Sequence, residues 1–296
     1  MNLKRDLVTT MKENKSELEF LYAGDIWYAL WGSDYPKPLA DTISDAVAKS
    51  DVTFMAGDYS FWEYKPHNSM IMFNSVMKHE KKTNFFSSIY PFCRGEENEL
   101  VFCDMHGSEE GDIEGYIKLR KNNAAPIWMF NPLYFKQQKL LSQRVGEHNG
   151  NQKFMVYGIG WDIIKTPQRS IKIYEGEGDY EVALQKFLRE NPGKTEDDFP
   201  LVKKADASHM NFIDVVKCDD AYGFSSDIYS ISEFKYNGTK FYCMEIAVLL
   251  YSDEQVKDER GLRIKLYANK KLMGEYKPQV GDNISGVMQL CAYLCE

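Results

Sequence analysis

The sequence lacks any long apolar run, and this absence limits the classes of protein that it can encode. The longest clean stretch, Ile246–Tyr251, is far short of the roughly 20 residues that a membrane-spanning helix needs. The first residues, Met1–Asp6, are followed by mixed polar sequence without the apolar segment of a secretion signal. We therefore expect a cytoplasmic protein with no membrane partner.

The common nucleotide-binding and hydrolase motifs are also missing. There is no G-x-x-x-x-G-K-[ST] phosphate loop, no G-x-G-x-x-G followed by a helix, no H-E-x-x-H and no G-x-S-x-G. These absences exclude the motif-bearing versions of such enzymes only. Catalytic sites that are assembled from residues far apart in the chain stay open.

The six cysteines do not form a metal or redox spacing. None belongs to a C-x-x-C pair, and most lie among apolar or β-prone residues, as in Phe102-Cys103 and Tyr242-Cys243-Met244. We interpret them as reduced thiols that pack as small apolar side chains. An even count also allows three disulfides, but the sequence gives no sign of secretion.

Positive charge is scarce, and the deficit is spread evenly along the chain. The formal net charge is −8, with 17 Lys/Arg against 21 Asp/Glu in residues 1–150 and 19 against 23 in the rest. Neither part is a basic arm or an acidic tail. A surface of this charge repels nucleic acid and anionic lipid, so we expect no nucleic-acid partner.

What is present is the composition of a folded globular protein. Hydrophobic residues make up 44% and aromatic residues 14% of the 296 residues, enough for a sizeable core. Amphipathic spacing predicts helices over 2–21, 39–50, 131–146 and 180–191. Short β-prone runs predict strands over 52–55, 70–73, 100–103, 113–119, 127–130, 154–164, 170–174, 262–267, 273–276 and 280–290.

Two local signals are stronger than the rest. Asn237-Gly238 lies between alternating runs and predicts a two-residue type I′ hairpin, because both turn positions need a positive φ. Gly158 and Gly160 interrupt a β-prone run and predict a bulge, a bend or a close backbone approach. Gly193–Asp206 is polar and contains Pro200, so it is the expected linker.

The order of these elements predicts an α+β fold in which β structure dominates and most pairs are antiparallel. We expect an N-terminal domain over residues 1–175 with helices around a sheet, a helix and linker over 176–208, and a β-rich domain over 209–296. The C-terminal pattern is similar to the last strands of small β-barrels, OB-like ones included, so a small barrel or a sandwich is expected there. Gly111–Leu119 also echoes Gly281–Leu290, which leaves a duplication open.

One segment has the residue types of a metal site. Residues 96–114 hold eight Asp or Glu and no Lys or Arg, with Asp104-Met-His106 in the middle. Asp and His two apart on a strand point to the same face, and both bind divalent cations. Glu109 and Asp112 follow in the same segment and complete a candidate set of four ligands. A divalent metal ion bound there would activate water for hydrolysis. The alternative interpretation is a solvated turn with a loop histidine.

The aromatic stretch from Tyr22 to Tyr64 offers a second candidate site. Trp27, Trp31 and Trp62 are the kind of side chain on which a sugar or a planar ligand stacks, and they are equally suited to a core. Three functions therefore stay open. We favour a cytoplasmic interaction or binding protein without catalysis, whose partner is a protein or a second copy. The others are a metal-dependent hydrolase and saccharide or planar-ligand binding; no cofactor is expected unless a divalent metal is bound.

Overall fold

The structure is a computed structural model. It describes residues 24–66, 70–80, 83–107, 114–122, 124–143, 151–167, 170–174, 178–200, 202–206, 211–218, 221–249 and 261–295. The helix expected over 2–21 and the loop residues Glu109 and Asp112 lie outside these ranges.

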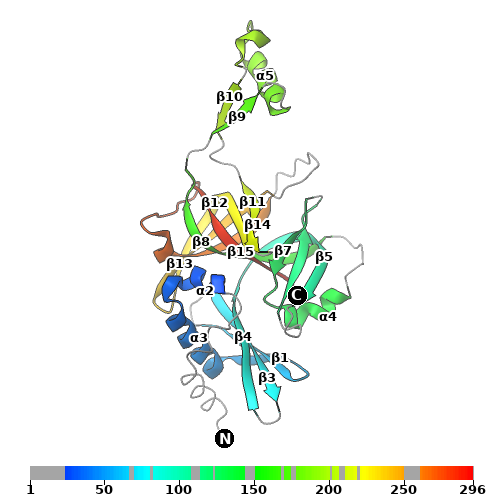
Figure 1. Ribbon diagram of the computed structural model, residues 1–296, viewed down its shortest axis with the longest axis vertical. Helices are drawn as coiled ribbons and strands as arrows, with labels where there is room; N and C mark the ends of the chain where they lie inside the picture. Colours follow the sequence, from blue (N-terminus) through cyan, green and yellow to red (C-terminus); the bar gives the residue numbers. More distant parts are fainter. Residues whose placement is uncertain are drawn as a thin grey trace.

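The described chain is dominated by strands, as expected, with few helices (Figure 1). The helices are α2 (Gly24–Trp31), η2 (Gly32–Asp34), α3 (Pro36–Lys49), α4 (Tyr134–Ser142), α5 (Gly178–Glu190), η3 (Glu196–Asp198) and η4 (Lys270–Met273). The strands are β1 (Asp51–Ala56), β2 (Tyr59–Tyr64), β3 (Ile71–Glu80), β4 (Thr83–Cys93), β5 (Glu96–Gly107), β6 (Gly115–Arg120), β7 (Ile127–Phe130), β8 (Gln152–Lys165), β9 (Ser170–Tyr174), β10 (Val202–Asp206), β11 (Phe212–Cys218), β12 (Ala221–Tyr236), β13 (Thr239–Val248), β14 (Leu262–Asn269) and β15 (Asn283–Leu294).

These strands form three sheets. A four-stranded sheet has the order β1-β2-β3-β4, and a two-stranded sheet joins β10 to β9. A nine-stranded sheet contains strands from both sides of the expected domain boundary, in the order β11-β12-β13-β14-β8-β15-β7-β6-β5. Among the named strands, only the β14–β8 and β15–β7 pairs are parallel, so the expectation of a mostly antiparallel α+β fold is confirmed.

Two further pairings turn the nine-stranded sheet back on itself. Because β8 also pairs with β5, a first ring runs β5-β6-β7-β15-β8 and returns to β5. Because β12 also pairs with β15, a second ring runs β12-β13-β14-β8-β15 and returns to β12. The two rings therefore share β8 and β15, which pair with each other along most of their length.

Each shared strand serves one ring with its first half and the other ring with its second half. In β8, residues 152–156 pair with β5, whereas residues 157–160 pair with β14. In β15, residues 283–289 pair with β12, and Cys291 pairs with Phe130 of β7. The segments β5–β8 and β12–β15 therefore have the same order of pairings, and β5, β6, β7 and β8 correspond to β12, β13, β14 and β15. The sequence similarity between Gly111–Leu119 and Gly281–Leu290 does not match this correspondence, because it aligns β6 with β15.

One apolar cluster fills the interior of both rings. Its buried members include Leu100, Ile117 and Phe154 in the first ring and Met244 and Leu266 in the second. Gly158 and Gly160 belong to the shared strand, and a Cβ atom on Gly158 would lie 2.8 Å from Met288 Sδ. The absence of a side chain at Gly158 therefore makes room for the side chains of Met288 and Leu266, and not for a closely approaching backbone segment.

A second apolar cluster covers the outside of the shared strands and of β13 and β14. The helices α2 and α3 and the four-stranded sheet pack there against Tyr157, Tyr267 and Cys291. Polar contacts reinforce this layer: Tyr157 Oη donates to the Pro91 carbonyl at 3.0 Å, and Asn269 Nδ2 donates to the Leu30 carbonyl at 2.7 Å. Because both faces of β8 are covered, its residues Val156–Gly160 are all buried.

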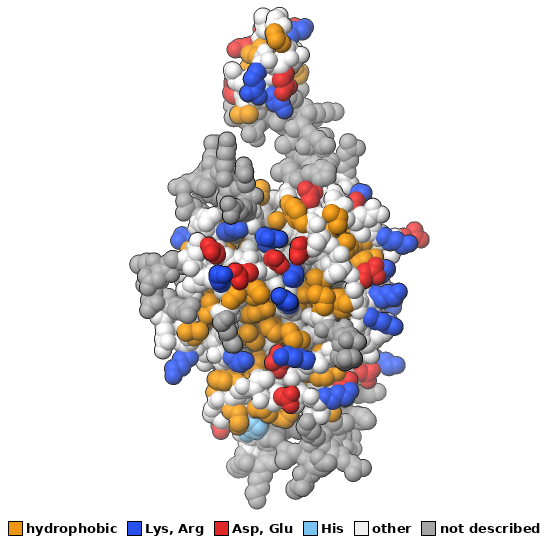
Figure 2. Space-filling model, turned by 180° about the vertical axis from the view of Figure 1, so that it is seen from behind, with side chains coloured by type: hydrophobic (Ala, Val, Ile, Leu, Met, Phe, Trp, Pro, Cys, Tyr) orange, Lys and Arg blue, Asp and Glu red, His pale blue; other side chains and the backbone are white. Residues whose placement is uncertain are grey.

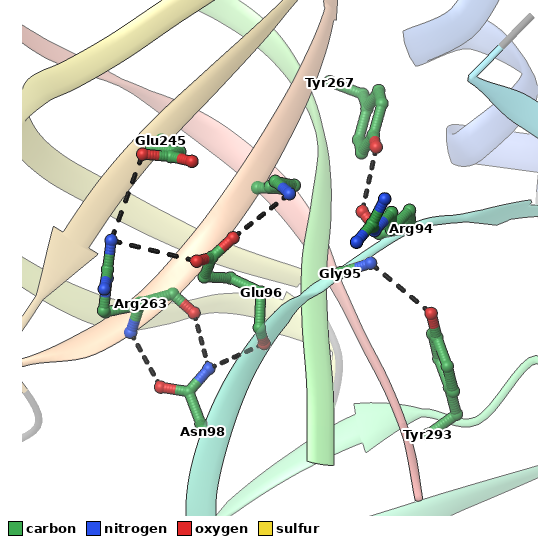
Figure 3. Close-up of polar contacts among 9 residues, drawn as sticks. Arg94, Gly95, Glu96, Asn98, Glu245, Arg263, Tyr267 and Tyr293 are labelled. Atoms are coloured by element: carbon green, nitrogen blue, oxygen red, sulfur yellow. Dashed lines mark hydrogen bonds and ion pairs between the residues drawn. The ribbon is translucent and has the colours of Figure 1, made fainter. Parts of the chain in front are cut away.

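A buried amide joins β5 of the first ring to β14 of the second (Figure 3). Asn98 Nδ2 donates to the Arg263 carbonyl at 2.7 Å and to the Glu96 carbonyl at 3.0 Å. In return, Asn98 Oδ1 accepts from the Arg263 backbone N–H at 3.0 Å. The side chain thus replaces a missing pair of ladder hydrogen bonds between two strands that are not otherwise paired.

One small unit stands apart from the rest of the molecule (Figure 1). β9, α5 and β10 project from the end of β8 and return to β11, and Tyr180, Leu184 and Phe199 form their own apolar cluster. The expected helix is present as α5. The expected linker, in contrast, contains η3 and the paired strand β10. The division into the domains 1–175, 176–208 and 209–296 stays a prediction.

Other local predictions have mixed outcomes. The Asn237-Gly238 hairpin is confirmed, with φ values of 44° and 78° and β12 paired to β13 on either side. The helix expected over 39–50 is present as α3, which buries Ile43, Ala46 and Val47 as expected but begins earlier, at Pro36. The strand expected over 273–276 is wrong: the chain there leaves η4 and turns at Gly274, whose φ is positive.

The described cysteines are free thiols: Cys93, Cys103, Cys243, Cys291 and Cys295. No helix in the described ranges is both long enough and apolar enough to cross a membrane. On the side shown in Figure 2, basic and acidic side chains alternate over the body with apolar side chains between them.

Candidate functional site

The outward face of β5, β6 and β7 carries the best candidate site. Its members are Asp104, His106, Tyr116, Lys118 and Trp128, and we call this set the β5–β7 face. Cross-strand pairing aligns Asp104 with Lys118 and Trp128, and the next row aligns His106 with Tyr116. Asp104 and His106 are exposed, whereas the other three are half-buried.

A β-bulge in β5 puts these side chains on the outside. Phe102 pairs with Leu119, both in the core, and the register then shifts by one residue before Asp104 pairs with Lys118. Without the extra residue, Asp104 would lie opposite the fully buried Ile117 and point into the core. The bulge therefore keeps Asp104 and His106 on the same side as Tyr116 and Lys118.

The aromatic rings of the β5–β7 face contact one another. His106 stacks on Tyr116, with ring centroids 5.2 Å apart and an interplanar angle of 23°. Trp128 meets His106 nearly edge-on at 4.9 Å, and Lys118 Nζ lies 5.2 Å from the centroid of the Trp128 ring. The backbone beneath is fixed from the second ring, because Tyr222 Oη donates to the Trp128 carbonyl at 2.8 Å.

Of the four candidate metal ligands, the structure describes Asp104 and His106. Asp104 and His106 lie on one face, as expected for alternate residues of a strand, and Asp104 Oδ1 accepts a hydrogen bond from the Met105 N–H at 2.8 Å. Glu109 and Asp112 lie outside the described residues. Within the described ranges, no group of three His, Cys, Asp or Glu side chains is arranged to hold a metal ion. The four-residue metal site thus stays a prediction.

Two of the three candidate tryptophans lie in the core. Trp27 is 1% and Trp31 5% exposed, and their rings stack on each other at 5.5 Å and on Phe73. Their position follows from α2, on which residues four apart share the buried face. Neither ring is on a surface that a ligand reaches, so the expected stacking site of Trp27 and Trp31 is corrected to core packing.

Trp62 is half-buried and belongs to a hydrogen-bonded group that the sequence did not indicate. Its Nε1 donates to Ser60 Oγ at 2.6 Å, and Ser60 Oγ lies 2.8 Å from His79 Nε2. A serine beside a histidine is the geometry of an activated nucleophile. Here, however, Ser60 is 1% exposed and its oxygen already accepts from Trp62, so a substrate does not reach it.

The buried cysteines are not candidate nucleophiles either. Burial raises the pKa of the Cys93 thiol well above its usual value, and it also raises that of Cys243. The reactive form of cysteine is the thiolate, which burial disfavours. These thiols therefore act as apolar packing residues, in agreement with the interpretation of the sequence.

Sequence reasoning named Asp104 and His106 but missed Tyr116, Lys118 and Trp128. Alternation within each strand marks Tyr116 and Lys118 as one face of β6, but it does not show which strands are neighbours. Comparison with known proteins does not supply that information: no protein-family model, no curated protein and no solved structure matches the chain.

Proposed function

We propose that the chain is a non-catalytic binding protein whose β5–β7 face contacts its partner. The observation that carries this proposal is the aromatic group of His106, Tyr116 and Trp128, partly exposed beside the hydrogen-bonding side chains of Asp104 and Lys118. Aromatic side chains combined with a few polar groups are typical of recognition surfaces.

The order of the strand pairings also supports the β5–β7 face as the binding surface. Numbered along the chain, the strands of the first ring pair in the order 1-2-3-5-4-1, with strands 3 and 5 parallel. We propose that this ring is an OB-like barrel, a fold in which the face of strands 2 and 3 binds oligonucleotides or oligosaccharides. Those strands correspond to β6 and β7 here. The second ring has the same order of pairings when β12 is counted as its first strand, β15 as its fourth and β8, which precedes β12 in the chain, as its fifth.

The free thiols support a reducing compartment, and we place the protein in the cytoplasm on that ground. The partner that we favour is a protein. Metal-dependent hydrolysis at Asp104 and His106 stays a weaker proposal, because two of its four ligands lie outside the described residues.

The proposal is tested by following the indole N–H signals of the five tryptophans by NMR while ligands are added. The probes are a basic peptide, a neutral hexasaccharide and a single-stranded oligothymidylate. Trp128→Phe identifies the Trp128 signal by its loss. We expect at least one probe to shift that signal and to leave the buried Trp27 and Trp31 signals in place. If no probe shifts the Trp128 signal, the β5–β7 face is not the binding surface.

A further inference from the structure

We infer that β5–β8 and β12–β15 are two copies of one four-stranded unit, and that each copy closes its ring with the fourth strand of the other. The chain is therefore a strand-exchanged dimer of this unit within a single polypeptide, and β8 and β15 form the interface between the copies. Three observations support this: a correspondence between single residues, a two-fold axis between β8 and β15, and contacts that occur in equivalent pairs.

The first observation is a correspondence between single residues, and it begins at the two bulges. In β5, Phe102 pairs with Leu119, and the register then shifts by one residue. In β12, Ile228 pairs with Ile246, and the register shifts in the same way at the next residue. The first strand of each unit therefore has a bulge at the same place, and Phe102 corresponds to Ile228. A bulge is a feature of one strand and does not follow from the order of the strands alone.

The pairings of the first strands extend this correspondence to β8 and β15. Counting back from the bulge, Asn98 of β5 corresponds to Phe224 of β12. Asn98 pairs with Phe154, and Phe224 pairs with Gly286. Phe154 of β8 therefore corresponds to Gly286 of β15, and the other residues of these two strands follow with the same shift in residue number.

The pairings of the third strands give the same shift independently. Across β6 and β13, Phe130 of β7 corresponds to Tyr267 of β14. Phe130 pairs in parallel with Cys291, and Tyr267 pairs in parallel with Ile159. Ile159 of β8 therefore corresponds to Cys291 of β15, which is the shift that the first strands gave. This agreement means that the two units are equivalent along all four strands.

The second observation is a two-fold axis between the shared strands. With this shift, Gly158 corresponds to Leu290, and the two residues lie directly opposite each other in the antiparallel pair. The residue pairs on either side of them exchange with one another under the same relation. The axis therefore passes between Gly158 and Leu290. An interface of this kind, in which two copies offer each other the same surface, is typical of dimers.

The third observation is that contacts between the units occur in equivalent pairs. Tyr222, near the start of β12, donates to the Trp128 carbonyl of β7. The equivalent residues are Glu96, at the start of β5, and Lys265 of β14, which form an ion pair at 3.2 Å. The side chains differ, but both contacts join the first strand of one unit to the third strand of the other.

The interiors of the two rings agree, whereas their outward faces differ. Four equivalent pairs of inward residues are apolar in both units: Phe102 and Ile228, Ile117 and Met244, Leu119 and Ile246, and Met129 and Leu266. On the outside, Lys118 corresponds to Glu245. The cluster under α2, α3 and the four-stranded sheet includes Phe130 and Tyr267, so this single layer contacts both units. One asymmetric layer on a two-fold axis cannot make the same contacts with both, which accounts for the different outward residues.

The correspondence is tested by moving interior side chains from one unit to the other within the full chain. The transplant gives the second unit the interior of the first: Ile228→Phe, Met244→Ile, Ile246→Leu and Leu266→Met. The control carries the same four new side chains in shuffled positions: Ile228→Leu, Met244→Phe, Ile246→Met and Leu266→Ile.

The two variants have the same composition, so only the placement of the side chains separates them. We expect the transplant to melt at least about 5 °C above the control, because each side chain enters the environment that it fills in the first unit. A transplant that melts no higher than the control, or that fails to fold as the control does, would overturn the correspondence.

The exchange of strands is tested by cutting the folded full chain between the units. Protease sites inserted after Pro167 and before Asn211 release the projecting β9, α5 and β10, and leave two fragments that each hold one unit. We expect the fragments to stay together in size-exclusion chromatography and to melt in one transition that shifts downward on dilution, because each ring takes strands from both fragments.

Substitutions in the cut chain locate the interface. Leu290→Ala, at the axis, should weaken the association of the fragments at least about tenfold. Asn269→Ala removes a hydrogen bond from the second unit to α2 and should weaken it less. Fragments that separate on cutting, or an association that Asn269→Ala weakens as much as Leu290→Ala, would show that β8 and β15 are not the interface between the units.

Discussion

The two rings have the same order of strand pairings but differ in the burial of their outward side chains. In the second ring, the outward side chains of β13 and β14 are packed under α2, and Asn269 of β14 hydrogen-bonds the end of that helix. In the first ring, the outward side chains of β5, β6 and β7 are partly exposed, and of the described aromatic residues there only Phe130 is buried. The strand order is the same in both rings, so it does not determine whether an outward face is exposed. The elements that pack on that face determine it.

The largest effect is expected where the rings depend on the same strand. Leu290 is fully buried in β15 opposite Gly158, and Leu290→Ala should lower the free energy of unfolding by about 3 kcal/mol through the cavity that it leaves. Urea denaturation should show one transition, because neither ring closes without β15. Val280→Ala, at a 60% exposed position, is the control and should cost under about 0.5 kcal/mol. Two transitions, of which one moves, would mean that the rings fold independently.

The next effect concerns Asn98, one of the contacts that join the rings outside the shared strands. Asn98→Ala removes three hydrogen bonds and leaves the Arg263 N–H and carbonyl without their partner. The expected loss is about 2 kcal/mol, measured by urea denaturation. Asn151→Ala, at an exposed position next to β8, should have little effect. An equal loss in both variants would remove any special role for the buried amide.

A smaller effect is expected for a turn that belongs to the second ring alone. Gly238 has a φ of 78°, a conformation that costs an L-residue about 1 kcal/mol. Gly238→Ala should lower the melting temperature and increase hydrogen exchange mainly in β12 and β13. Faster exchange in β5 and β6 to the same extent would show that the two rings do not respond separately to local strain.

The smallest effect is a pH dependence at the start of β15. Burial alone would raise the pKa of Asp282, but hydrogen bonds from Lys165, Tyr276 and the Gln279 N–H outweigh burial and lower it. The stability from this carboxylate is therefore complete above its ordinary value of 3.8 and is lost as the pH falls through the lowered pKa. Asp282→Asn should be less stable than the parent at pH 6, with the difference shrinking below pH 4. A difference that is constant with pH would assign the effect to packing.

The sequence predicted the elements that depend on neighbouring residues. The hairpin at Asn237-Gly238, the helix α3 and the helix α5 each carry turn, capping or periodic signals within a few residues of one another. It predicted strands over 154–164 and 280–290 but not that two rings share them, because β8 pairs with β14 and β15, more than 100 residues further along the chain. The strand expected over 273–276 is absent because Met273 belongs to the 3₁₀ turn Lys270–Met273 and Gly274 then turns the chain with a positive φ.

The candidate site was only partly predictable for the same reason. Asp104 and His106 were identified because alternate residues of one strand share a face. Trp27 and Trp31 were weighed as surface rings because aromatic content does not distinguish a core from a ligand site. Trp128 was missed because its meeting with His106 depends on three strands in register and on a bulge before Asp104.

The position of β15 in the chain has a consequence for synthesis. The first ring needs β15 next to β7, yet Asn283–Leu294 is translated more than 150 residues after Phe130. The second ring needs β15 beside β12 as well. On the ribosome, both rings therefore stay unclosed, with strand edges exposed, until these last strand residues have emerged. Folding dominated by such distant contacts is slow and prone to aggregation, so we expect the nascent chain to depend on chaperones until β15 has been added.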